Sequence, residues 1–100
     1  MNMKQLQKMM KQAQSMQSQL EEEMSEIEVD GSSGGGMVTV ALDGKKNLKS
    51  INIQKDVVDP DDVEMLQDLI LAAVTDAGRK VDEMLSSRLG SMSSGLLGGL

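Results

Sequence analysis

Four glycines lie within six positions, in the stretch Gly31-Ser-Ser-Gly-Gly-Gly36, and glycine-rich turns can bind phosphate in nucleotide-binding proteins. Such a loop needs a Lys-Ser/Thr pair after its glycines and a helix whose N-terminus faces the anion. Here Met37 follows the last glycine, and a strand-like alternation follows Met37. A dinucleotide-binding turn likewise needs a helix after its glycines. The sequence therefore predicts a flexible connection between two strands, since glycine adopts positive φ at little steric cost.

The carboxylates form two clusters, at residues 21–23 and 59–62, that could be imagined as metal or proton-transfer sites. Three consecutive helix positions point in different directions, so the first cluster cannot converge on one ion. The second cluster has the composition of a helix N-terminus. The chain has no cysteine, no histidine and no aromatic residue. It therefore lacks thiolate and imidazole ligands, Cys nucleophiles and rings that stack on bases. We expect no enzyme, metal, cofactor or small-molecule substrate.

The lysines near the N-terminus are the groups best placed to bind a polyanion. Lys4, Lys8 and Lys11 are three or four residues apart, which puts them on one face of a helix. Gln5 and Gln12, one heptad apart, lie beside them. Such a face could contact DNA phosphates, with amides near sugars or base edges. The alternative is a solubilising polar face. Few contacts per helix would make binding weak and sensitive to salt.

The net charge of −6 argues at first against a nucleic-acid partner, but it hides alternating blocks of charge. Residues 1–20 carry +3, residues 21–30 carry −6, residues 31–55 carry +3 and residues 56–68 carry −6. Local fields, and not the total, decide what a surface attracts. We expect the acidic end of the first helix to lie near the lysines of the sheet.

Residues 3–27 are predicted to form a long helix, because their apolar residues recur in steps of three and four. They are Met3, Leu6, Met10, Ala13, Leu20, Met24 and Ile27. Three short strands are predicted next. The first begins near residues 27–29, the second spans residues 37–42 and the third spans residues 48–53. The turn signal Asp43-Gly44 joins the last two in a hairpin.

A second helix is predicted with Asp59 as N-cap, Pro60 at its first position and an end near Leu89, with Gly90 as the stop. We expect one domain over residues 1–90 and a flexible Ser/Gly/Leu tail over residues 91–100. The fold class is α+β, with two long antiparallel helices flanking a small three-stranded antiparallel sheet. The helices should pack along their apolar stripes, which would bring Arg79, Lys80 and Arg88 to the same tip as the N-terminal lysines.

The chain resembles the YbaB/EbfC nucleoid-associated proteins over roughly residues 1–90. The resemblance rests on the Met/Gln/Lys-rich first helix, on GSSGGGMVTVALDGKKNLKSINI, and on DPDDVEMLQDLILAAVTDAGRKVDEM. It implies a homodimer whose sheets join, with paired helices projecting like the arms of tweezers. It also implies DNA binding by those arms, with low or modest sequence preference, in the bacterial nucleoid.

We therefore predict a cytoplasmic, nucleoid-associated homodimer that binds double-stranded DNA through Lys4, Gln5, Lys8, Lys11, Gln12, Arg79, Lys80 and Arg88. It would affect nucleoid organisation and gene expression. We expect no membrane partner, because no apolar run approaches 18 residues. The alternative is a prefoldin-like chaperone or coiled-coil adaptor, which has the same order of long helices and hairpin and would use exposed methionines at the helix tip.

Overall fold

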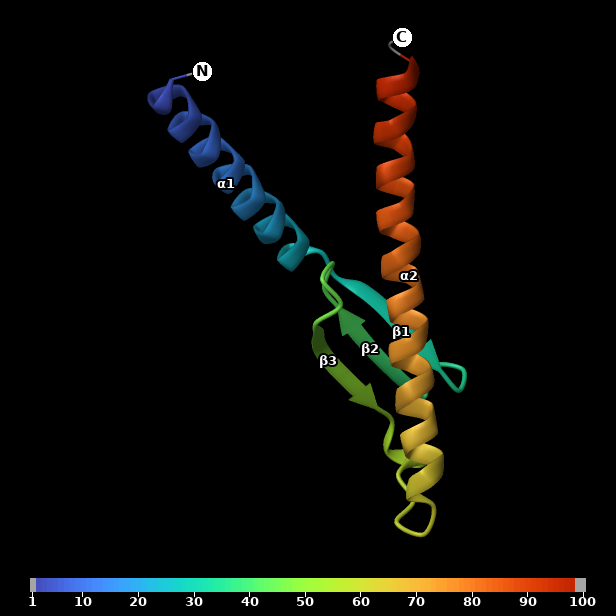
Figure 1. Ribbon diagram of the computed structural model, residues 1–100. Helices are drawn as coiled ribbons and strands as arrows, with labels where there is room; N and C mark the ends of the chain where they lie inside the picture. Colours follow the sequence, from blue (N-terminus) through green and yellow to red (C-terminus); the bar gives the residue numbers. More distant parts are fainter. Residues whose placement is uncertain (1, 99–100) are drawn as a thin grey trace.

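The computed structural model describes residues 2–98, and the side chains of residues 2–90 (Figure 1). Its helices are α1 (Met3–Glu26) and α2 (Val63–Gly98), and its strands are β1 (Val29–Ser33), β2 (Val38–Leu42) and β3 (Leu48–Ile53). A short 3-10 helix, η1 (Lys55–Val57), follows β3. The strands form one antiparallel sheet in the order β1-β2-β3, so the predicted α+β fold, with its α-β-β-β-α order, is confirmed.

The helix α1 begins at a capped end and finishes against the sheet. The Asn2 Oδ1 accepts the N–H of Gln5 at 2.8 Å, which satisfies one of the free donors of the first turn. At the other end, the Gly44 N–H donates to the carbonyl of Met24 at 2.9 Å. The Nζ of Lys45 lies 4.0 Å from the Glu21 Oε2. The expected approach of the sheet lysines to the acidic end of α1 is therefore confirmed.

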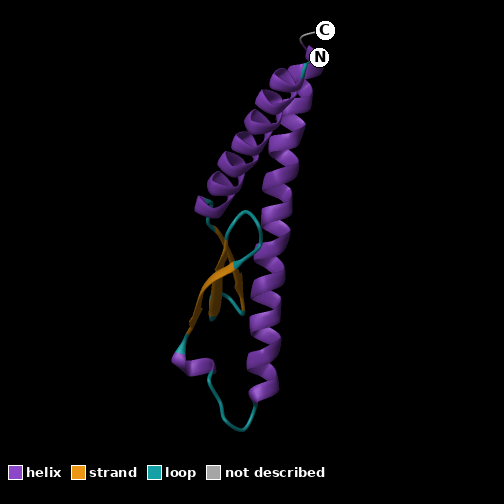
Figure 2. Ribbon diagram, turned by 60° about the vertical axis from the view of Figure 1, so that its left-hand side comes forward, coloured by secondary structure: helices purple, strands orange, loops and turns teal. Residues whose placement is uncertain are grey.

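The two helices diverge from the sheet and do not pack along each other. In Figure 1, β1 continues the line of α1, whereas α2 crosses the sheet at a slant; the helices overlap only in the view of Figure 2. The described chain is elongated, with extents of 69 × 31 × 17 Å. No residue of α1 is buried. The prediction that the helices pack along their apolar stripes is therefore wrong within one chain, because the short link at residues 27–28 commits α1 to the direction of β1.

The core lies between the sheet and α2. The central strand β2 contributes Val38, Val40 and Leu42, which are all buried. The helix contributes Ala73, Ala77 and Val81, which recur every four residues on the face toward the sheet. This helix lies over β1 and β2, while every residue of β3 except Ile53 stays exposed.

The glycine-rich stretch divides into two parts. Residues 34–36 form the turn that joins β1 to β2, and Gly34, Gly35 and Gly36 have φ values of 59°, 69° and 94°. The predicted strand connection is thus confirmed for these residues. The prediction is wrong for Gly31, which belongs to β1 and is buried. A Cβ at Gly31 would lie 2.6 Å from the Cβ of Ala77 and would also clash with backbone atoms of α2.

The bounds of α2 differ from the prediction at both ends. The helix begins at Val63, and its first turn is capped by Asp62, whose Oδ1 accepts the N–H of Met65 at 3.2 Å. Asp59 instead organises the preceding turn, where its Oδ1 accepts the N–H of Asp61 at 2.9 Å. At the other end, the helix continues through Gly90 to Gly98. The domain at residues 1–90 and the flexible tail at residues 91–100 stay predictions, and residues 99–100 lie outside the described part of the chain.

Candidate nucleic-acid interface

The lysine face of α1, which we define as Lys4, Lys8 and Lys11, lies opposite the apolar stripe of the same helix. At 100° per residue the three lysines fall within one narrow sector, and Leu6, Ala13 and Leu20 fall on the far side. All three lysines are exposed, and none of them takes part in an ion pair among the side chains of residues 2–90. Their charges are therefore available to an external anion.

Two glutamines border the lysine face. Gln5 and Gln12 are exposed and follow Lys4 and Lys11 directly, so they project about a quarter-turn from the lysines. Their amides can donate and accept hydrogen bonds beside any phosphate that the lysines contact. The structure thus brings the five predicted residues of α1 onto adjoining faces.

The basic character of this face ends halfway along α1. The same sector of the helix continues with Ser15 and Ser18 and then with Glu22 and Glu26. The face is positive toward the free N-terminus and negative toward the sheet. A polyanion is consequently attracted to the distal half of α1 and repelled from the half near the sheet.

The structure places Arg79 and Lys80 beside β1 and away from the tip, so the predicted gathering of these residues with the N-terminal lysines is wrong. The Arg79 Nη2 donates to the Asp76 Oδ1 at 2.8 Å, and the Lys80 Nζ lies 3.1 Å from the Asp76 Oδ2. The N–H of Ser32 also donates to Asp76, and it is the first cause, before Arg79 and Lys80, that lowers the pKa of this carboxyl to about 2. The carboxylate of Asp76 in turn raises the pKa of Arg79.

Arg88 is the predicted basic residue of α2 that lies beyond the sheet. It is exposed, and its position is eight residues after Lys80, or about 12 Å further along the helix axis. In Figure 1 this part of α2 projects past the sheet on the same side as α1. Arg88 thus lies on the part of α2 that projects beyond the sheet, whereas Arg79 and Lys80 lie on the part that packs beside β1.

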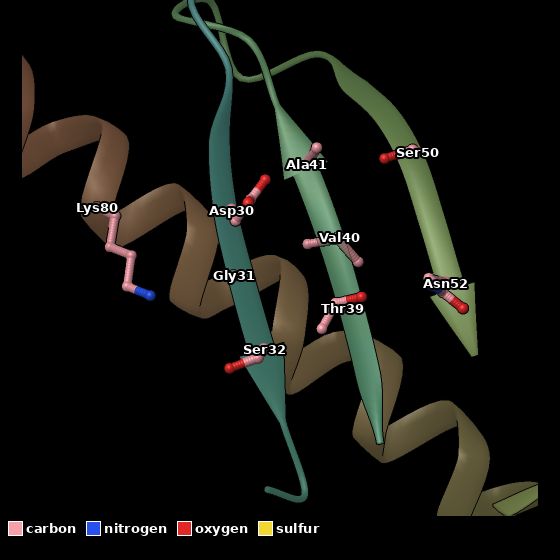
Figure 3. Close-up of a pocket in the computed structure, with 9 residues that line it drawn as sticks. All are labelled: Asp30, Gly31, Ser32, Thr39, Val40, Ala41, Ser50, Asn52 and Lys80. Carbon is pink, nitrogen blue, oxygen red and sulfur yellow. The ribbon is translucent and has the colours of Figure 1, made fainter. Parts of the chain in front are cut away.

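The face of the sheet away from α2 carries small polar side chains around a hollow of about 330 Å³ (Figure 3). The hollow is lined by Asp30, Gly31, Ser32, Thr39, Val40, Ala41, Ser50, Asn52 and Lys80. None of its hydroxyls, on Ser32, Thr39 and Ser50, donates a hydrogen bond to a carboxylate among the described side chains, as an activated nucleophile would. Among the described residues no group of three acidic side chains converges as a metal site would need.

The sequence pattern does not identify the residues that order the β2–β3 hairpin loop and hold it against the helices. The hairpin loop is organised by Asp43, a buried carboxylate that accepts the N–H groups of Lys45 and Asn47 at 2.8 and 2.9 Å. These bonds, above all that from Asn47, lower the pKa of Asp43. The Asp-Gly turn signal was visible, since Asp commonly bonds the backbone two residues on. The ion pair of Lys46 with Asp82, at 2.7 Å, joins distant segments and had no local signal.

A three-stranded sheet with two helices that project beyond it, one with an exposed lysine face, defines a class of small α+β proteins. The sequence pattern of the YbaB/EbfC DNA-binding family matches residues 3–96, and the chain belongs to this family. Its similarity to proteins of known sequence covers nearly its whole length. It is 54% identical to a nucleoid-associated protein of Clostridium botulinum (strain Eklund 17B / Type B), over 99% of this chain and 88% of that protein.

A more distant relative and a solved structure are also similar to this chain. A nucleoid-associated protein of Chloroflexus aurantiacus is 44% identical over 98% of both chains. Among solved structures, an uncharacterized protein of Helicobacter pylori is similar in fold, with a TM-score of 0.70 and 28% sequence identity. That match covers 92% of this chain and 97% of the other. Neither helix of the described chain has a stretch both long and apolar enough to cross a bilayer.

Proposed function

We propose that this protein binds double-stranded DNA in the nucleoid as a homodimer, with low sequence specificity and without catalysis, and thereby affects nucleoid organisation and gene expression. The observation that carries the proposal is the lysine face at the distal half of α1, exposed and unpaired among the described side chains. Membership of a DNA-binding family and the names of the nucleoid-associated relatives support it.

The chemistry of the arm favours backbone contacts over base reading. Lys4, Lys8 and Lys11 are point charges on flexible stems, which suit phosphates but carry no sequence information. Gln5 and Gln12 can add hydrogen bonds to sugars or to base edges. A pair of amides is a small set for direct readout, so we infer low sequence specificity.

The basic residues of α2 are a second set of proposed phosphate contacts, and they differ in how far a nearby carboxylate offsets their charge. Arg88, on the projecting part of the helix, is available for a phosphate. Arg79 and Lys80 are proposed as further contacts, with their charge partly offset by Asp76, which both of them already bind.

A dimer would give the weak arms a useful affinity. Three phosphate contacts per arm provide little binding at physiological salt. When two arms share one body, the second arm binds at a high effective concentration. The acidic blocks near the sheet and at the start of α2 would keep the body away from DNA, so that two arms straddle or bridge the duplex.

The proposal is tested by fluorescence anisotropy with random and AT-rich duplexes across a salt series. The triple variant Lys4→Ala/Lys8→Ala/Lys11→Ala should weaken binding and flatten the log–log salt slope by roughly 2.7 per arm, because each phosphate contact contributes about 0.9. A matched pair of single variants is the control: Lys8→Ala and Lys55→Ala each remove one positive charge, and Lys55 lies in η1, away from the lysine face. An unchanged slope in the triple variant, with its dimer intact, would contradict the proposal.

A chaperone-like function is the second candidate, because the apolar stripe of α1 is exposed. Met3 is 76% exposed and Met16 is 70% exposed, as a client-binding surface would require. Prevention of client aggregation without any shift of duplex DNA would favour this alternative. A DNA shift without holdase activity favours the proposed function.

A further inference from the structure

The β2–β3 hairpin reaches the C-terminal end of α1, next to the point where the chain enters β1 (Figure 1). The Gly44 N–H donates to the carbonyl of Met24 at 2.9 Å, and the Lys49 Nζ donates to the carbonyl of Ser25 at 2.8 Å. The last four carbonyls of a helix have no partner within that helix. The hairpin therefore supplies two donors that the end of α1 cannot obtain from its own backbone.

The charges of the hairpin also suit this end of α1. The helix ends with glutamates at positions 21–23 and 26, and its last turn carries no basic residue. Negative charge near a helix C-terminus is unfavourable, because the helix dipole is itself negative there. The hairpin brings to this place the ammonium group of Lys49 and that of Lys45, whose Nζ lies 4.0 Å from the Glu21 Oε2. Two cations of the hairpin thus offset a repulsion that the helix alone would leave.

Gly44 allows the hairpin to approach α1 closely. A Cβ at this position would lie 2.9 Å from the carbonyl oxygen of Met24 and 3.2 Å from its Sδ and Cε. All three distances are shorter than an ordinary van der Waals contact of 3.4–4 Å. A larger residue at position 44 would therefore push α1 and the hairpin apart.

The same loop is fixed to the rest of the molecule. Asp43, which is buried, orders it from within, and the Lys46 Nζ lies 2.7 Å from the Asp82 Oδ1 in α2. Lys46 holds this position with a φ of 68°, a conformation that residues other than glycine seldom adopt. The ion pair is exposed and contributes little by itself, but the strand β2, from which the loop leaves, packs against α2 in the core. The hairpin therefore contacts both helices, and α2 cannot move relative to it without disturbing the core.

We propose that Gly44, Lys45 and Lys49 form a clamp that sets the angle between α1 and α2 and so positions the lysine face of α1. The link at residues 27–28 makes α1 diverge from α2, but each residue of the link keeps two rotatable backbone bonds, through which an unattached helix would swing. The clamp removes this freedom. Its effect on DNA binding rests on the proposed function, because an arm that is already fixed loses less conformational freedom when it binds.

The angle can be measured by double electron–electron resonance between two spin labels, since the chain has no cysteine of its own. Gln7→Cys in α1 and Ser86→Cys in α2, both at exposed positions, carry the labels, and an excess of unlabelled chain restricts the measurement to distances within one chain. The Cβ of Gly44→Ala displaces the Met24 carbonyl by about 0.5 Å before ordinary contact is reached. The mean label distance should then change by roughly 3 Å, because Gln7 is about six times further along the helix from residues 27–28 than Met24 is.

The matched control is Gly78→Ala, where a Cβ meets no atom within 4 Å, and it should leave the label distance unchanged. A second variant leaves the backbone of the loop intact. Lys49→Met removes the bond to Ser25 and should broaden the distribution of label distances, whereas Lys49→Arg, which can still donate, should keep it narrow. Lys55→Met removes the same charge in η1 and should change nothing. With circular dichroism showing folded variants, an unchanged distance in Gly44→Ala, or an unchanged width in Lys49→Met, overturns the clamp.

DNA binding by the unlabelled chain separates the clamp from the proposed function. Gly44→Ala keeps every charge, so it should raise the Kd for a random duplex several-fold while leaving the log–log salt slope unchanged. A changed label distance with an unchanged Kd overturns the positioning of the lysine face while the clamp itself stands. If the unmodified chain binds no duplex, the proposed function fails, and the label distances still decide whether the hairpin sets the angle.

Discussion

The N–H of Ser32 donates to the carboxylate of Asp76 at 3.0 Å, and this bond ties the edge strand β1 to the middle of α2. The same carboxylate binds Arg79 and Lys80, so one side chain joins two elements and orders two cations. Asp76 thus adds a hydrogen bond to β1 beside the apolar contacts of Ala73, Ala77 and Val81 that hold α2 on the sheet.

We expect Asp76→Asn to destabilise the fold in a pH-dependent way. The folded pKa of Asp76 is about 2 and its ordinary value is 3.8, so its stabilising effect is complete above pH 4 and is lost as the pH falls through 2. Urea unfolding followed by circular dichroism should show a lower midpoint for the variant at pH 7. The difference should shrink between pH 4 and pH 2. The matched control is Asp68→Asn, which removes the same charge at an exposed position of the same helix.

The order of elements could be predicted from the sequence because each element has a strong local signal. Periodic apolar residues define α1, and the Asp43-Gly44 turn defines the hairpin. The prediction that Asp59 is the N-cap of α2 is wrong because Asp59, Asp61 and Asp62 are all of a residue type that caps helices, and local sequence does not choose among them. The helix uses Asp62, and Asp59 closes the turn before it.

The directions of the arms could not be predicted from the sequence. An apolar stripe such as that of α1 shows that a helix needs a partner, but it does not show whether the partner is in the same chain. The short link at residues 27–28 decides that α1 diverges from α2. For the same reason Arg79 and Lys80 could be assigned to a helix but not to the sheet side of that helix.

Gly31 and Gly78 should respond oppositely to alanine. A Cβ at Gly31 would clash with the backbone of α2 at Ala73 and Ala77, so Gly31→Ala should destabilise the protein by about 1–3 kcal/mol or more. A Cβ at Gly78 meets no atom within 4 Å, and alanine favours a helix. Gly78→Ala should therefore stabilise it by roughly 0.5–1 kcal/mol. Chemical denaturation of both variants checks the pair, and destabilisation by Gly78→Ala would show that this flank of α2 is closely covered.

The two basic groups of α2 should differ in their effect on DNA binding. Arg88→Ala should flatten the salt slope by about 0.9 per arm, as the loss of a full phosphate contact does. Arg79→Ala should flatten it less, because Asp76 and Glu83 already offset that guanidinium. Anisotropy across a salt series measures both slopes. Equal slopes for the two variants would show that DNA displaces Asp76 from Arg79.

Extending the basic sector of α1 should strengthen DNA binding. Glu22 and Glu26 lie on the same side of the helix as the lysine face, where they repel the phosphate backbone near the sheet. Glu22→Gln/Glu26→Gln should lower the Kd for a random duplex several-fold at low salt, with a smaller gain at high salt because the repulsion is screened. The matched control is Glu64→Gln/Asp68→Asn, which changes the net charge equally at the opposite end of the molecule. If both pairs tighten binding alike, total charge governs affinity. If only the first does, DNA lies along α1, and the glutamates mark how close to the sheet the duplex can come.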